Sequence, residues 1–166
     1  MGIYTKWGLS RELIVYSFFT SGLLVIAFID AKTTFIPDVI TIPGMIAGLI
    51  LQFSFAFIDK NFANLFDAGL GMALGFAVFG FIVIASRGGM GIGDIKLAGL
   101  IGVFLGLKST FLTIWMSFIF GGIAGIFLLV SKIKGRKDAI PFGPYLVMGA
   151  LASMFWGEKI LKWWLG

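Results

Sequence analysis

The sequence predicts an all-α integral membrane protein, a polytopic bundle of about six transmembrane helices in which the fourth helix is short. Hydrophobic residues make up 59% of the 166-residue chain and charged residues only 13%, whereas roughly 25% of the residues in soluble domains are charged. Long apolar runs alternate with short polar loops along the chain, which is typical of successive membrane-crossing helices. No linker-like, low-complexity or repeated segment interrupts them, so we expect residues 1–166 to form a single transmembrane domain.

The first expected helix, residues 13–29, is just long enough to cross a bilayer core of about 30 Å. The alternative is a cleaved signal peptide with Lys6 and Arg11 as its basic end. The apolar run is long for that role, however, and no convincing cleavage site of small residues follows it. Residues 39–58 form the second expected helix, which tolerates Pro43 near its start.

Four further helices complete the expected bundle. The third covers residues 68–85, the fifth 111–130 and the sixth 140–157. The fourth, residues 95–107, is too short to cross the bilayer unaided and contains Lys96. We therefore expect that neighbouring helices shield it, or that the Lys96 side chain extends to the membrane surface.

The residue types present exclude several kinds of chemistry. The chain contains no cysteine and no histidine, which excludes disulfides, thiol nucleophiles, histidine-based triads and the usual zinc sites. Its net charge of +5 would suggest nucleic acid as the partner of a soluble protein, but the basic residues lie in short loops between apolar runs. Membrane orientation explains them better, so the expected partner is the lipid bilayer and not nucleic acid.

Two carboxylates, those of Asp30 and Asp94, lie where apolar runs meet polar loops. A carboxylate at the edge of a membrane helix is costly, so its presence indicates a function. Two expected helices separate the loops beside Asp30 and Asp94, so both loops face the same compartment. The basic cluster in residues 132–137 lies two helices further on and marks that face as cytoplasmic. If the fourth helix does not span, the cluster changes sides, whereas the two aspartates still share a face.

Glycines precede Asp94 in the segment 88–94, GGMGIGD. They remove side-chain bulk, permit positive φ and let another backbone approach, so an extended peptide can lie there. A phosphate loop is the alternative, but the GxxxxGKS/T pattern is absent. Helix capping is the alternative function for Asp94. For Asp38, at the start of the expected helix 39–58, we prefer an N-cap function to a catalytic one.

Two carboxylates on one membrane face can hydrolyse a peptide bond. Because like charges held a few ångströms apart cannot both ionise easily, the pair shares one proton. One carboxylate then deprotonates a water molecule while the other protonates the scissile carbonyl oxygen. This chemistry requires no metal, cofactor or covalent intermediate.

Three segments, taken together, resemble the type IV prepilin peptidases. They are FID at residues 28–30 with IPDVITIP at 36–43, GMGIGDIKL at 89–97, and IPFGP at 140–144. Presenilin-like proteases share the GxGD element, so that element alone is weak evidence. The resemblance implies a multi-pass aspartic endopeptidase of the cell membrane that removes the leader from type IV prepilins or pseudopilins at the cytoplasmic face.

The resemblance also implies functions for individual residues. Asp30 and Asp94 match the two catalytic positions. Lys96 matches a basic position that can bias the charge of the pair or contact phosphate headgroups. Larger family members carry a cysteine-containing segment and methylate the new pilin terminus, so this cysteine-free chain looks like a short form for which methyl transfer is doubtful and no cofactor is expected. The expected substrate-binding or supporting residues are Asp38, Gly89, Gly91, Gly93, Lys96 and Pro141.

Two other functions remain open from the residues alone. A small transporter or proton pathway would also use membrane carboxylates, but it requires them near the bilayer midplane, whereas Asp30 and Asp94 are expected near its surface. A structural subunit of a secretion assembly would use the same aspartates only as helix caps.

Overall fold

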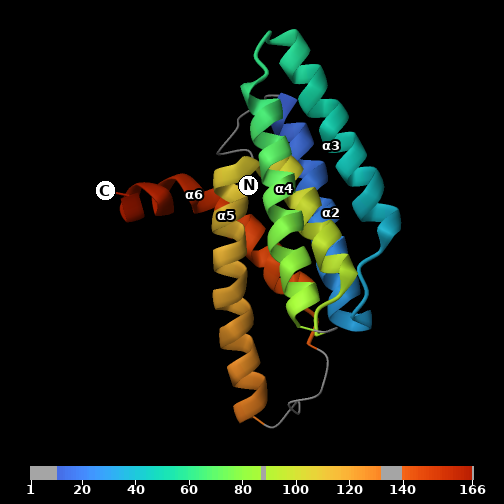
Figure 1. Ribbon diagram of the computed structural model, residues 1–166, viewed down its shortest axis with the longest axis vertical. Helices are drawn as coiled ribbons and strands as arrows, with labels where there is room; N and C mark the ends of the chain where they lie inside the picture. The colour runs from blue at the N-terminus through green and yellow to red at the C-terminus, as the bar shows by residue number, and fades with distance from the viewer. Residues whose placement is uncertain (1–10, 87–88, 132–139, 166) are drawn as a thin grey trace.

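The computed structural model describes residues 11–86, 89–131 and 140–165, most of which belong to five α-helices (Figure 1). No strand occurs among the described residues. In chain order the helices are α2 (Arg11–Thr33), α3 (Asp38–Ile58), α4 (Ala63–Ala85), α5 (Ile92–Val130) and α6 (Gly143–Leu165).

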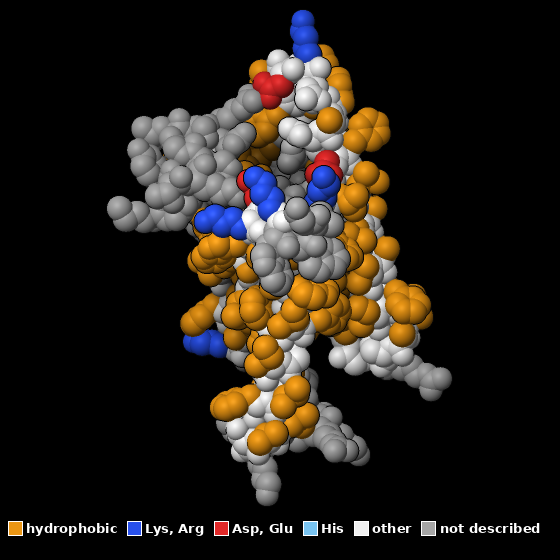
Figure 2. Space-filling model, turned by 90° about the vertical axis from the view of Figure 1, so that its left-hand side faces the viewer, with side chains coloured by type: hydrophobic (Ala, Val, Ile, Leu, Met, Phe, Trp, Pro, Cys, Tyr) orange, Lys and Arg blue, Asp and Glu red, His pale blue; other side chains and the backbone are white. Residues whose placement is uncertain are grey.

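Four of these helices are long and apolar enough to cross a membrane: α3, α4, α5 and the Leu13–Thr33 part of α2. Large apolar side chains point away from the bundle, and Phe18, Phe81 and Ile84 are 77%, 73% and 80% exposed. Figure 2 shows hydrophobic side chains over much of the described surface on one face. So large an apolar surface suits hydrocarbon rather than water, and the all-α membrane class is confirmed.

The structure describes five helices where six were expected, because the expected fourth and fifth helices are the two limbs of α5, which are continuous through a break. α5 has 39 residues, and at Gly106 its backbone leaves the helical conformation with φ 73° and ψ 180°. In Figure 1 the first limb of α5 runs from the lower end of the bundle upward, and the second limb returns downward. Residues 97–103 of the first limb are all buried, so neighbouring helices do shield this short segment.

Polar side chains from three other helices stabilise the break at Gly106. A broken helix leaves N–H and C=O groups without intrahelical partners, and such groups are costly in an apolar medium. Three hydrogen bonds pair them: the Leu107 N–H donates to Asp67 of α4 (3.2 Å), Gln52 of α3 donates to the Val103 carbonyl (3.3 Å), and Tyr16 of α2 donates to the Phe104 carbonyl (3.4 Å).

Glycines let α4 pack closely against the first limb of α5. A Cβ on Gly71 would lie 2.5 Å from the Gly102 carbonyl oxygen, and a Cβ on Gly75 would lie 2.6 Å from the Ala98 carbonyl oxygen. Small residues commonly allow this backbone approach between membrane helices. The limb that begins near Asp94 is therefore held firmly by α4.

Candidate active site

Three helix termini meet at one end of the bundle: the end of α2, the start of α5 and the start of α6 (Figure 1). Asp30 lies in the last turn of α2 and Asp94 in the first turn of α5. Their side chains are only 4% and 7% exposed. The two carboxylates lie close enough for the charge on Asp30 to act on Asp94. The fold therefore brings together two acidic groups that are distant in the sequence.

The carboxylate of Asp30 is held by the first residue of α6. Its Oδ2 accepts a hydrogen bond of 2.9 Å from the backbone N–H of Gly143, and the N-terminal end of a helix favours negative charge. A Cβ on Gly143 would lie 2.6 Å from the same oxygen, so only glycine allows this approach without displacement. Sequence reasoning did not name Gly143 as a site residue; the only signal was its place in the IPFGP segment.

Asp94 both caps its helix and keeps one oxygen without a partner. Its Oδ2 accepts a hydrogen bond of 3.2 Å from the backbone N–H of Gly91, the N-cap residue of α5. Its Oδ1 is buried and accepts no hydrogen bond from the described residues. A helix cap alone does not require this second oxygen to be buried, and leaving it unpaired is costly. The unpaired Oδ1 is therefore the atom that distinguishes Asp94 from an ordinary capping aspartate.

Asp38 is not the N-cap that the sequence predicts. The N-cap of α3 is Pro37, whose extended backbone has φ −73° and ψ 123°, and no side chain caps this helix. Asp38 is instead the first residue of α3, where the helix dipole still stabilises its negative charge. Its Oδ2 lies 2.6 Å from the Nζ of Lys96. Lys96 is thus engaged in an ion pair that joins the start of α3 to the start of α5.

The glycines before Asp94 differ in what they contact. A Cβ on Gly93 would lie 2.8 Å from the Cβ of Ile36, so Gly93 permits close packing against the segment between α2 and α3. Gly89 and Gly91 are exposed, which leaves room beside them. These three residues do not adopt the positive φ that glycine permits, and Gly106 alone among the described glycines has a positive φ. Gly88 lies outside the described residues.

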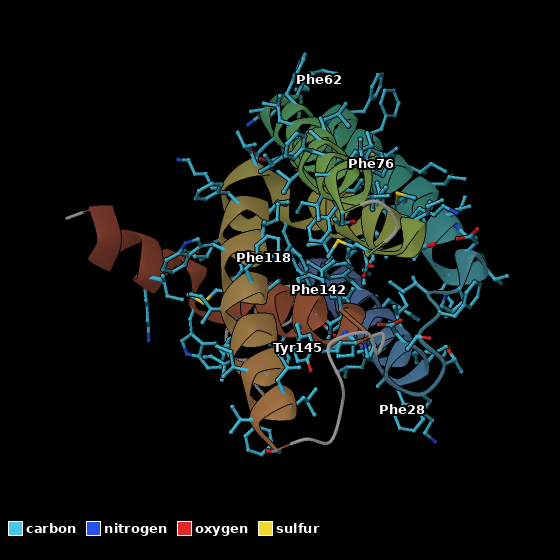
Figure 3. The ribbon with its side chains drawn as sticks, turned by 60° about the horizontal axis from the view of Figure 1, so that its bottom comes forward. Phe28, Phe62, Phe76, Phe118, Phe142 and Tyr145 are labelled. Carbon is cyan, nitrogen blue, oxygen red and sulfur yellow. The ribbon has the colours of Figure 1, made fainter. Side chains whose placement is uncertain are left out.

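Pro141 lies just before α6 and is half-buried. The next residue, Phe142, packs its ring 5.5 Å from that of Phe118 and 6.3 Å from that of Tyr145 (centroid distances). Figure 3 shows these three labelled rings between the second limb of α5 and the start of α6. This aromatic cluster fixes the start of α6, and with it the N–H that Gly143 presents to Asp30.

Two further points concern the orientation of the site in the membrane and its capacity to bind a metal ion. The basic cluster of residues 132–137, on which the cytoplasmic orientation depends, lies outside the described residues. Within the described residues, no group of three or more histidine, cysteine, aspartate or glutamate residues could hold a metal ion.

Comparison with known proteins places the chain in a family. The sequence pattern of the type IV leader peptidase family matches residues 17–126, which include Asp30 and Asp94. The chain belongs to the type IV leader peptidase family. The start of α6, with Gly143, lies beyond the residues matched by this leader peptidase pattern.

Curated leader peptidases resemble the chain along nearly its whole length. The prepilin leader peptidase/N-methyltransferase of Legionella pneumophila is 32% identical over 100% of this chain and 58% of its own length. The proteins of the same name from Pseudomonas aeruginosa and Aeromonas hydrophila are 33% and 30% identical, over 98% and 99% of this chain and 57% and 56% of their own lengths. The chain thus spans a little over half the length of these relatives. No solved structure matches it significantly.

Proposed function

We propose that this member of the leader peptidase family is a membrane-embedded aspartic endopeptidase. Its proposed reaction removes the leader peptide from type IV prepilins or pseudopilins at the cytoplasmic face of the cell membrane. One observation carries the proposal: the last turn of α2 and the first turn of α5 bring two buried carboxylates to the same end of the bundle, and Oδ1 of Asp94 has no donor among the described residues. Such a pair can bind and activate a water molecule.

In the proposed reaction, Asp30 is the base and Asp94 carries the shared proton. The N–H of Gly143 and the start of α6 stabilise a negative charge on Asp30. Oδ1 of Asp94 lacks a donor among the described residues, so a proton on that oxygen removes the cost of an unpaired charge. Asp30 takes a proton from the attacking water while Asp94 donates its proton to the scissile carbonyl oxygen. The C–N bond then breaks as the proton on Asp30 passes to the leaving amine and the hydroxyl proton returns to Asp94.

The substrate must present an extended backbone at the cleaved bond, because the peptide groups of an intact helix are engaged in their own hydrogen bonds. The exposed Gly89 and Gly91 leave space for such a strand beside Asp94. We propose that the apolar helix of the substrate lies in the bilayer and unwinds at this end. The proposal covers cleavage alone, although the relatives' names also include N-methyltransferase.

The alternative function, a transporter or proton pathway, is less well supported. Asp30 and Asp94 lie in the last turn of α2 and the first turn of α5, whereas an ion pathway requires acidic groups deeper in the bilayer.

Cleavage of a synthetic prepilin by the protein reconstituted in vesicles tests the proposal. Mass spectrometry of the product is expected to show loss of the leader with the wild-type protein and with Asp59→Asn, a control at the opposite end of α3. Asp30→Asn and Asp94→Asn keep the size of the side chain but cannot exchange the proton, and are expected to leave the substrate intact. Absence of cleavage by the wild-type protein, or full cleavage by either active-site variant, contradicts the proposal.

A further inference from the structure

We propose that Asp38 and Lys96 are positioning residues, whose ion pair sets the separation of the two aspartates in the active site. This inference rests on the proposed function, because it concerns the geometry of the same reaction. It assigns a task to the two residues for which the sequence left several functions open.

A short segment that follows Asp30 contacts the residues on both sides of Asp94. We call residues 31–38, which run from the residue after Asp30 to the start of α3, the strap. The strap begins with a tight turn in which the N–H of Thr34 donates to the Asp30 carbonyl (2.8 Å). Thr34 has a φ of 53°, which residues with a side chain rarely adopt. Contacts further along the strap must therefore hold this turn in place.

Two contacts attach the strap to the first turns of α5. Ile36 is 6% exposed and packs on Gly93, where a Cβ would lie only 2.8 Å from the Ile36 Cβ. Further along both segments, two residues after Ile36 and three after Gly93, the Asp38 carboxylate lies 2.6 Å from the Lys96 ammonium. Gly93 and Lys96 flank Asp94, so the strap joins the backbone around one aspartate to the backbone around the other.

Direct packing between α2 and α3 does not replace the strap, because these two helices touch at few residues. α2 also contacts α5 directly, where Tyr16 and Phe19 meet Phe104, but these residues lie near the Gly106 break. At the end that carries Asp30 and Asp94, the packing of α2 against α6 and the strap hold the two aspartates relative to each other. The ion pair is partly exposed, with side chains 30% and 50% accessible, so water and salt screen it and it adds little to overall stability. Catalysis is more sensitive than stability to the loss of this ion pair, since a misplacement of a catalytic group by about 1 Å can reduce a rate by roughly 100-fold.

Kinetics of leader cleavage distinguish positioning from a surface ion pair without function. Lys96→Met and Asp38→Asn are expected to lower kcat by about tenfold or more, with KM within about twofold of wild type and an unchanged unfolding temperature. Lys96→Arg keeps the ion pair and is expected to retain most of kcat. Glu158→Gln, an exposed charge change on α6, is the control and is expected to have no effect. Wild-type kcat in Lys96→Met, or a loss confined to KM, contradicts the inference.

A second measurement does not depend on activity. Because the chain has no cysteine, the double variant Asp30→Cys/Asp94→Cys reports on the separation of these positions through its rate of disulfide formation in membranes. Adding Lys96→Met is expected to slow that rate several-fold, whereas adding Lys96→Arg is expected to leave it nearly unchanged. Equal rates in all three proteins overturn the inference even if the wild-type enzyme cleaves prepilin. Failure of the wild-type enzyme to cleave refutes the proposed function separately.

Discussion

Replacing Gly143 with alanine should reduce leader cleavage by displacing the base. The new Cβ would lie 2.6 Å from Oδ2 and 3.1 Å from Cγ of Asp30. To reach an ordinary contact, the carboxylate or the start of α6 has to move by roughly 0.8 Å. That movement also disturbs the 2.9 Å hydrogen bond from the Gly143 N–H. Because a misplacement of about 1 Å costs about 100-fold in rate, we expect kcat to fall by about that factor, or roughly 2.7 kcal/mol of transition-state stabilisation.

The assay is cleavage of a synthetic prepilin in vesicles under single-turnover conditions, which separates chemistry from substrate binding and product release. Gly80→Ala is the matched control, because its Cβ would meet nothing within 4 Å beyond its chain neighbours and the backbone of its own helix. That variant is expected to cleave at the wild-type rate. If Gly143→Ala also cleaves at the wild-type rate while remaining folded, Asp30 is not held as the structure indicates, and the assignment of Gly143 is wrong.

Three further predictions concern stability, packing and topology. Gly106→Ala places a side chain at positive φ beside an α4 carboxylate, so it should destabilise the protein by about 1–3 kcal/mol; an unchanged unfolding temperature in detergent contradicts this. Gly93→Ala should lower kcat because its Cβ would lie 2.8 Å from the Cβ of Ile36. The double variant Gly93→Ala/Ile36→Gly removes that Cβ and should recover part of the loss; equal activity of wild type and single variant argues against close packing there. Phe35 and Asn61 lie in loops at opposite ends of α3, so single-cysteine variants at these positions report on membrane orientation. An impermeant maleimide should label Asn61→Cys in intact cells and Phe35→Cys only after permeabilisation; the reverse pattern refutes a cytoplasmic active site.

Features that depend on composition or on local sequence were predictable. Apolar content and the length of the apolar runs predicted an all-α membrane protein, and most helices lie near their expected ranges. Asp30 and Asp94 could be singled out because a charge at the end of an apolar helix is costly wherever the helix packs.

Features that depend on distant partners were not predictable from the sequence. Separate helices over residues 95–107 and 111–130 were predicted, but the place and form of the break between them were not, because the break at Gly106 relies on side chains from α2, α3 and α4. The function of Gly143 depends on Asp30, which lies far away in the sequence. Asp38 was expected to cap α3, but Pro37 takes the N-cap position with its restricted φ, which frees the carboxylate for Lys96.

The most direct test of the central claim is whether Asp30 and Asp94 act as one unit. Single-turnover cleavage rates should be measured for Asp30→Asn, Asp94→Asn and the double variant. Two groups that share one proton have strongly non-additive effects, so each single variant is expected to fall to the same low rate as the double variant. A single variant that keeps a substantial rate, or a double variant whose loss equals the product of the two single losses, contradicts a shared two-carboxylate mechanism.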